Sequence, residues 1–132
     1  MKSTATAAEY LKERLRGLAD EQFRILYLNR RHALLEDALI AQGAVDAVRP
    51  SLRTIVARAL QTNATGLIAA HNHPSGAAEP SEADRLLTRD LLATSAALSL
   101  RVLDHVIVAE EATHSFADSG VLDELALEAG VR

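Results

Sequence analysis

A chain of 132 residues has room for one compact domain, and 48% of its residues are hydrophobic, enough for a core and too many for a disordered segment. Two Tyr, two Phe and no Trp predict an aliphatic core and few rings on which single-stranded nucleic acid could stack. The chain has no cysteine, which excludes disulfides and thiolate metal sites. Any zinc ion would therefore need histidine and carboxylate ligands.

The net charge of −4 is divided unevenly along the chain. Residues 1–60 carry ten Lys/Arg against seven Asp/Glu, whereas residues 61–132 carry four against eleven. A domain that binds the DNA backbone unaided is expected to be more basic than this. No apolar run reaches the roughly 18 residues of a membrane span, and the first residues lack the apolar stretch of a secretory signal. We therefore expect a cytoplasmic protein with no membrane partner.

Hydrophobic periodicity predicts helices that alternate with strands. In chain order the pattern predicts a helix at 7–18, strands at 22–29 and 33–41 joined as an antiparallel hairpin, a helix at 51–61, a strand at 65–70, a loop at 71–80, a helix at 82–98, strands at 103–109 and 115–116, and a helix or loosely attached tail at 121–129. We find no repeat and no linker. The expected fold is a single α/β domain over 1–132, with a mixed β-sheet flanked by helices and its core at about 20–120.

The helix predicted at 82–98 has an apolar stripe at helical spacing. The residues of this stripe, expected to face the core, are Ala83, Leu86, Leu87, Leu91 and Leu98. The helix predicted at 51–61 has a similar stripe, which ends at Leu60.

The chemically informative segment is His71-Asn72-His73-Pro74-Ser75-Gly76, which follows the apolar strand predicted at 65–70. Residues two apart in extended backbone point to the same side, so His71 and His73 can face one point while Asn72 is directed away. An oxygen of Asp84, eleven residues further on, would complete three ligands and leave one position of a tetrahedral zinc open. Zinc held in this way lowers the pKa of its water to about 7.

The segment Pro80-Ser81-Glu82-Ala83-Asp84 also has a purely structural interpretation. It is typical of a capping box, in which Ser81 is the N-cap and Asp84 stands three positions on. The two interpretations are compatible, because the first turn of a helix can present Asp84 to a metal while Ser81 caps. Surface loops also often hold two histidines, so the residue pattern alone leaves the zinc site open.

The spacing His71-x-His73, seven residues, Ser81, two residues, Asp84 resembles the JAMM motif of the JAB/MPN metalloprotease superfamily. The string HNHPSGAAEPSEAD resembles in particular the RadC-type JAB domains of bacteria. Segments at 21–29, 52–60 and 103–116 are similar to RadC segments in the same order. Two departures are the run Leu52-Arg53-Thr54, where Pro-Arg-Glu is usual, and a single expected helix in place of a preceding helix-hairpin-helix region.

The resemblance implies a JAB/MPN-like (cytidine-deaminase-like) fold and a zinc-dependent hydrolase, in which zinc-bound water attacks an amide or isopeptide carbonyl. It implies three zinc ligands, His71, His73 and Asp84, and a hydrogen bond from Ser81 to the zinc water or the developing oxyanion. It also implies an upstream glutamate as general base. Glu21 is the best match for that base, and Glu36 is the second.

Other functions stay open at this point. The domain could be a non-catalytic or accessory zinc module in DNA repair or recombination, acting through DNA or a protein partner. A nuclease is the third alternative, although two His and one Asp suit zinc better than the magnesium pair typical of phosphodiester cleavage. Asp104-His105 could orient a metal ligand, touch substrate or be structural. The sequence leaves the substrate and the oligomeric state open, a homodimer included.

Overall fold

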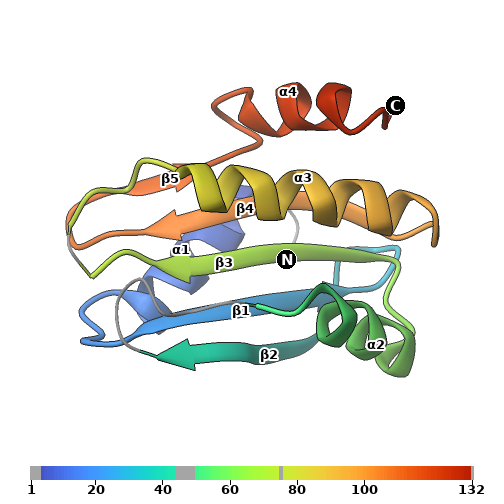
Figure 1. Cartoon of the computed structure of the whole chain (residues 1–132). Coiled ribbons are helices and arrows are strands. Elements are labelled where there is room, and N and C mark those ends of the chain that lie inside the picture. The colour runs from blue at the N-terminus through green and yellow to red at the C-terminus, as the bar shows by residue number, and fades with distance from the viewer. Residues whose placement is uncertain (1–3, 44–49, 75, 132) are drawn as a thin grey trace.

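A computed structural model describes residues 4–43, 50–74 and 76–131 of the chain (Figure 1). Its elements are α1 (Thr4–Leu15), β1 (Glu21–Leu28), β2 (Leu34–Gly43), α2 (Leu52–Thr62), β3 (Gly66–Asn72), α3 (Glu82–Ala96), β4 (Arg101–Val108), β5 (Thr113–Ser115) and α4 (Val121–Glu128). The five strands form one sheet in the order β2-β1-β3-β4-β5. In this described part of the chain, no helix is both long and apolar enough to cross a membrane.

The sheet is mixed, as predicted. The β1–β2 hairpin is antiparallel, β1 also pairs antiparallel with β3, and β5 pairs antiparallel with β4. The one parallel pair, β3 and β4, is joined through α3. Parallel strands end at the same edge of a sheet, so the carboxyl ends of β3 and β4 lie side by side. The α/β fold, a mixed five-stranded sheet flanked by four described helices, confirms the predicted JAB/MPN-like class.

Helices cover both faces of the sheet (Figure 1). Alternate residues of each central strand point to opposite faces, which separates the buried apolar side chains into two clusters. On one face α1 packs through Ala7, Leu11 and Leu15 against a cluster from β1, β3 and β4: Leu26, Leu28, Ile68, Ala70, Val106 and Val108. On the other face α2, α3 and α4 pack against Phe23, Ile25, Tyr27, Leu67, Ala69 and Ile107. Strands covered on both faces explain the near-continuous apolar runs in the sequence.

The predicted element bounds are off by a few residues, and each difference has a local reason. α1 ends at Leu15 rather than at residue 18, and Gly17 just beyond it has a φ of +80°, a conformation that breaks a helix. β3 runs on through His71 and Asn72, because these residues still pair with β4. The predicted loop therefore begins two residues later, at His73.

The buried stripe predicted for α3 is confirmed at Leu87 and Leu91, which pack in the core, and is wrong at Leu86 and Leu98. Leu86 and Leu98 are 40% and 45% exposed, whereas the buried residues of α3 are Thr88, Leu91, Leu92 and Ser95. The helix is rotated so that Thr88 faces the sheet, where its hydroxyl has polar partners described below. The stripe predicted for α2 ends too late, since Leu60 is 66% exposed.

Candidate metal centre

The carboxyl end of β3 brings His71 to the face of the sheet that α3 covers. His71 pairs with Phe23 of β1 in the register of the sheet, and its side chain is buried. His73 follows just past the strand, where its backbone N–H donates to the carbonyl of Val108 at 2.9 Å. The Nε2 atoms of the two histidines lie 2.9 Å apart, so the two rings converge as the i, i+2 spacing predicts.

Asp84 reaches this point from the first turn of α3. Its Oδ1 lies 3.1 Å from Nε2 of His71, and its Oδ2 lies 3.2 Å from Nε2 of His73. The predicted capping box is also present: Oγ of Ser81 accepts from the backbone N–H of Asp84 at 3.1 Å, and Oδ2 of Asp84 accepts from the N–H of Ser81 at 2.8 Å. The carboxylate therefore both caps α3 and faces the two histidines.

The hydrogen bonds on the far sides of the rings indicate which nitrogens are free. Nδ1 of His73 lies 2.7 Å from the carbonyl oxygen of Ala77, which can only accept, so Nδ1 carries the proton. Nδ1 of His71 lies 2.8 Å from Nε2 of His105. In both His71 and His73, Nδ1 therefore has a hydrogen-bond partner away from the cluster. Nε2 of each ring faces the other ring and Asp84.

The geometry of His71, His73 and Asp84 fits a metal ion. Each residue offers one ligand atom, and these atoms all lie within 4.8 Å of one another. Among the described residues, this is the group of His and carboxylate side chains that could hold a metal ion. A tetrahedral zinc with bonds of about 2.0–2.1 Å has ligand atoms about 3.3 Å apart. The two Nε2 atoms lie 2.9 Å apart, and each has one oxygen of Asp84 near it, Oδ1 at 3.1 Å from His71 and Oδ2 at 3.2 Å from His73, so each separation is close to this value. The lone pairs of the two Nε2 atoms and of the Asp84 oxygens repel one another unless a proton or a cation lies between them. The arrangement therefore favours binding of a cation.

Charge effects within the cluster have a consistent direction. Burial raises the pKa of the Asp84 carboxyl, but hydrogen bonds with His71 and His73 outweigh it and hold that pKa well below its usual range. The hydrogen bond to Asp84 raises the pKa of His73, against the lowering effect of burial, and the negative charge of Glu21 adds to the rise. The cluster is therefore an anionic pocket that favours a positive charge.

Glu21 lines the same cavity as His71 and Asp84, whereas Glu36 does not. The cavity has a volume of about 150 Å³ and is lined by Glu21, Phe23, Pro50, His71, Ala83, Asp84 and Leu87. Glu36 pairs instead with Tyr27, four residues along β1 from Phe23, which is about 13 Å at the rise of a strand. Its carboxylate is bound to Arg58 of α2. The geometry favours Glu21 over Glu36 as the glutamate that could reach a bound water.

The sequence comparisons identify the family. The family model described as RadC-like JAB domain matches residues 1–121. The chain belongs to the RadC-like JAB domain family. The resemblance predicted from the motif at 71–84 is thereby confirmed, and the converging side chains are those of that motif. Ser75 of the motif lies outside the described residues.

Curated relatives of this RadC-like JAB domain are bacterial UPF0758 proteins. The chain is 44% identical over 111 residues to UPF0758 protein VP0184 of Vibrio parahaemolyticus, covering 84% of this chain and 50% of that protein. It is 40% identical over 120 residues to UPF0758 protein YeeS of Escherichia coli, covering 91% and 81%. The chain therefore spans about half the length of the Vibrio relative.

Asn72, directed away from the cluster as predicted, holds the backbone on both sides of Glu21. Its Oδ1 accepts from the N–H of Gln22 at 2.7 Å, and its Nδ2 donates to the carbonyl of Asp20 at 3.0 Å. The two bonds tie the start of β1 to the end of β3. The amide thus fixes the segment that carries Glu21 relative to the two histidines.

The predicted Asp104-His105 pair divides into two roles in this RadC-like JAB domain. The buried carboxylate of Asp104 accepts from the hydroxyl of Ser115 and from the N–H groups of His105 and Ala117, which secures the connection from β5 to α4. Burial raises the pKa of Asp104. His105 instead contacts His71. Burial, together with the charge of His71, lowers the pKa of His105 well below its usual range.

Two residues of the site could not be expected from the sequence pattern. Thr88 is buried beside His105, with its Oγ1 2.6 Å from Nδ1 of that ring. Phe23 stacks on His71, with ring centroids 5.9 Å apart. The only signal for Thr88 is its spacing, one helical turn after Asp84, and for Phe23 its place on the strand that carries Glu21.

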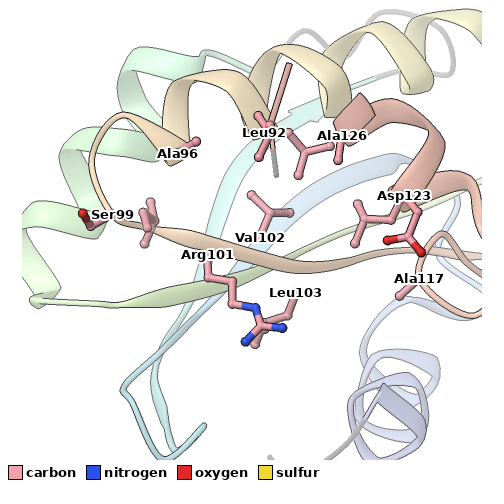
Figure 2. A pocket seen from close by; sticks show the side chains of 12 residues that line it. Leu92, Ala96, Ser99, Arg101, Val102, Leu103, Ala117, Asp123 and Ala126 are labelled. Carbon is pink, nitrogen blue, oxygen red and sulfur yellow. The ribbon is translucent and has the colours of Figure 1, made fainter. Parts of the chain in front are cut away.

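The larger hollow in the RadC-like JAB domain lies elsewhere (Figure 2). It has a volume of about 560 Å³ between α3, β4 and α4, and its walls are mostly apolar, including Leu92, Val102 and Ala126. Its charged lining residues are Arg101 and Asp123, and among the residues that the structure describes no converging group of metal ligands borders it. The smaller cavity is therefore the candidate functional site, because His71 and Asp84 of the metal cluster line it.

Proposed function

We propose that this RadC-like JAB domain is a zinc-dependent hydrolase of the JAMM metalloprotease type, which cleaves an amide or isopeptide bond. The observation that carries the proposal is the convergence of three ligand atoms, from His71, His73 and Asp84, beside a cavity that Glu21 lines together with His71 and Asp84. Three ligands leave a fourth position open for water or substrate, which distinguishes catalytic from structural zinc sites.

His71, His73 and Asp84 would hold the ion through Nε2, Nε2 and a carboxylate oxygen. When bound, zinc lowers the pKa of a coordinated water and polarises a carbonyl oxygen. The carboxylate of Glu21 would accept the proton of the attacking water and return it to the leaving amine. The hydroxyl of Ser81 would donate to the oxygen on which negative charge develops, while its lone pair keeps the bond from the N–H of Asp84.

The first test is the metal itself. Elemental analysis of the purified chain should give about one zinc per chain, and His71→Ala or Asp84→Ala should lose nearly all of it. His114→Ala provides the matched control, because His114 bonds to Ser119 outside the cluster and should keep full zinc. Full zinc in both ligand variants would refute the ligand assignment.

The second test separates the two glutamates. Zinc-loaded protein is incubated with fluorogenic pools of random linear peptides and of peptides joined through a lysine side chain. Glu21→Gln should keep zinc and lose turnover by a factor of about 10² or more, whereas Glu36→Gln should keep both. Stoichiometric zinc without cleavage in either pool would instead favour an accessory role in DNA repair or recombination, acting through DNA or a protein partner.

A further inference from the structure

His105 is a buried polar residue for which the proposed reaction has no use. It is 1% exposed and lies on β4, between His71 of β3 and Thr88 of α3. Its Nε2 is 2.8 Å from Nδ1 of His71, and its Nδ1 is 2.6 Å from Oγ1 of Thr88. The three side chains form one continuous line of hydrogen bonds that leads from the interior to the metal cluster.

The single proton of the Thr88 hydroxyl sets the direction of this line. Oγ1 of Thr88 also lies 2.7 Å from the backbone carbonyl oxygen of Asp84. A carbonyl oxygen has no hydrogen, so this contact is a hydrogen bond only if Thr88 donates. Oγ1 then accepts from His105, which places a proton on Nδ1 of that ring and leaves its Nε2 without one. Nε2 of His105 can in turn only accept, from Nδ1–H of His71.

We infer that Thr88 and His105 are positioning residues that hold His71 in the tautomer with hydrogen on Nδ1, so that its Nε2 offers a lone pair to the metal. The inference rests on the metal-binding part of the proposed function and not on catalysis. Metal-bound histidines commonly donate their other N–H to a fixed acceptor, and loss of that acceptor typically weakens metal binding 10- to 100-fold.

Packing holds the ring of His105 in place. What can still vary is which of its two nitrogens carries the hydrogen. The ring stacks on Phe116 at a centroid distance of 4.5 Å and an interplanar angle of 15°. Its other neighbour is Phe23, whose ring meets it edge-on at 5.7 Å. A free histidine side chain prefers hydrogen on Nε2. Without Thr88, that hydrogen would point at Nδ1 of His71 and favour the wrong tautomer there.

The test replaces one hydroxyl and measures zinc affinity. Thr88→Val keeps the branched shape and removes the hydroxyl, and the dissociation constant for zinc, measured by competition with a chelating dye, should rise 10- to 100-fold. Thr88→Ser keeps the hydroxyl and should restore affinity to within about threefold. Ser95→Ala is the matched control, since Ser95 is buried on the same face of α3 and its Oγ has no partner among the described residues.

A second readout is one that loss of packing alone would not change. Imidazole nitrogen NMR of the zinc-free protein should show His105 with hydrogen on Nδ1 in the wild type and in Thr88→Ser, and this pattern should be lost in Thr88→Val. Hydrogen on Nε2 of His105 in the wild type would overturn the inference, as would wild-type zinc affinity in Thr88→Val. Because the tautomer is read without zinc or substrate, a chain that binds zinc without hydrolysis leaves the inference standing.

Discussion

The cap at the start of α3 predicts that Ser81→Ala has two separable effects. The structural effect is the loss of the bond that Oγ of Ser81 accepts from the N–H of Asp84 at 3.1 Å. Loss of a serine N-cap costs about 1 kcal/mol. With an unfolding entropy of about 2.1 cal/mol/K for each of the 132 residues, this lowers Tm by about 4 °C.

Ser51 provides a matched control for this effect. It caps α2 in the same way, with Oγ accepting from the N–H of Thr54 at 3.2 Å, and α2 carries none of the three candidate metal ligands. Ser51→Ala should therefore lower Tm by a similar amount, about 4 °C, and leave turnover by the zinc-loaded protein unchanged. Ser81→Ala should also lower turnover, by a factor of about 10²–10³ if its hydroxyl donates to the oxyanion.

Ser81→Asp distinguishes the cap from the donor. Aspartate is a good N-cap but has no hydrogen to donate when ionised, so this variant should recover Tm and not turnover. Thermal unfolding followed by circular dichroism and the peptide-pool assay measure the two effects on the same samples. An unchanged Tm in Ser81→Ala would refute the cap. Equal turnover in Ser81→Ala and Ser51→Ala would refute the donor role.

Three further predictions concern other parts of the molecule. Hydrogen bonds from Tyr10 and Arg24 outweigh burial and lower the pKa of Asp37, so its stabilising effect is present above about pH 4 and is lost as pH falls toward the lowered pKa. Asp37→Asn should thus cost about 2 kcal/mol in urea unfolding near neutral pH, and less below about pH 4. Asn72→Ala should keep zinc and lower turnover, because Glu21 loses its backbone anchors. Removing zinc with a chelator should lower the free energy of unfolding by about 4 kcal/mol if free zinc had been about 1,000 times its Kd.

Controls and contradicting outcomes for these predictions come from the same chain. Glu9→Gln breaks a pair on α1 in which the carboxylate is 75% exposed, and it should cost less than about 0.5 kcal/mol. A pH-independent cost of Asp37→Asn would contradict the assignment of its pKa. Unchanged turnover in Asn72→Ala would show that Glu21 needs no anchor. The chelator should have no effect on His71→Ala.

The sequence predicted the fold class well because burial and periodicity are coupled in this chain. Strands covered on both faces must be apolar throughout, so β3 and β4 were recognisable without any partner in view. The hairpin could also be predicted, because its two strands are neighbours in the sequence and a short turn joins them. The full set of inward-facing residues of α3 could not be predicted locally: Leu86 stays exposed, whereas the polar residues Thr88 and Ser95 are buried beside the apolar ones. Thr88 has a polar partner on the sheet, His105 of β4, which the periodicity of α3 does not reveal.

The site could be predicted only in part for the same reason. The spacing of His71 and His73 in extended backbone is a local property, and it correctly anticipates two rings that converge. The choice between Glu21 and Glu36 depends on the register of β1 against both β2 and β3, which periodicity does not contain. The contact of His105 with His71 requires β4 to lie beside β3 in a parallel pair, a neighbour known only once the sheet is assembled.

Ser81 and Asp84 show why a motif of this kind leaves two interpretations open. A capping box and the JAMM motif both place a carboxylate three residues after a hydroxyl, so the pattern alone cannot separate them. In the structure Asp84 serves both roles: Oδ2 accepts from the N–H of Ser81 and also faces His73, while Oδ1 faces His71. Because the cap holds the carboxylate in one orientation before any ion arrives, the structural role is itself a means of positioning the ligand.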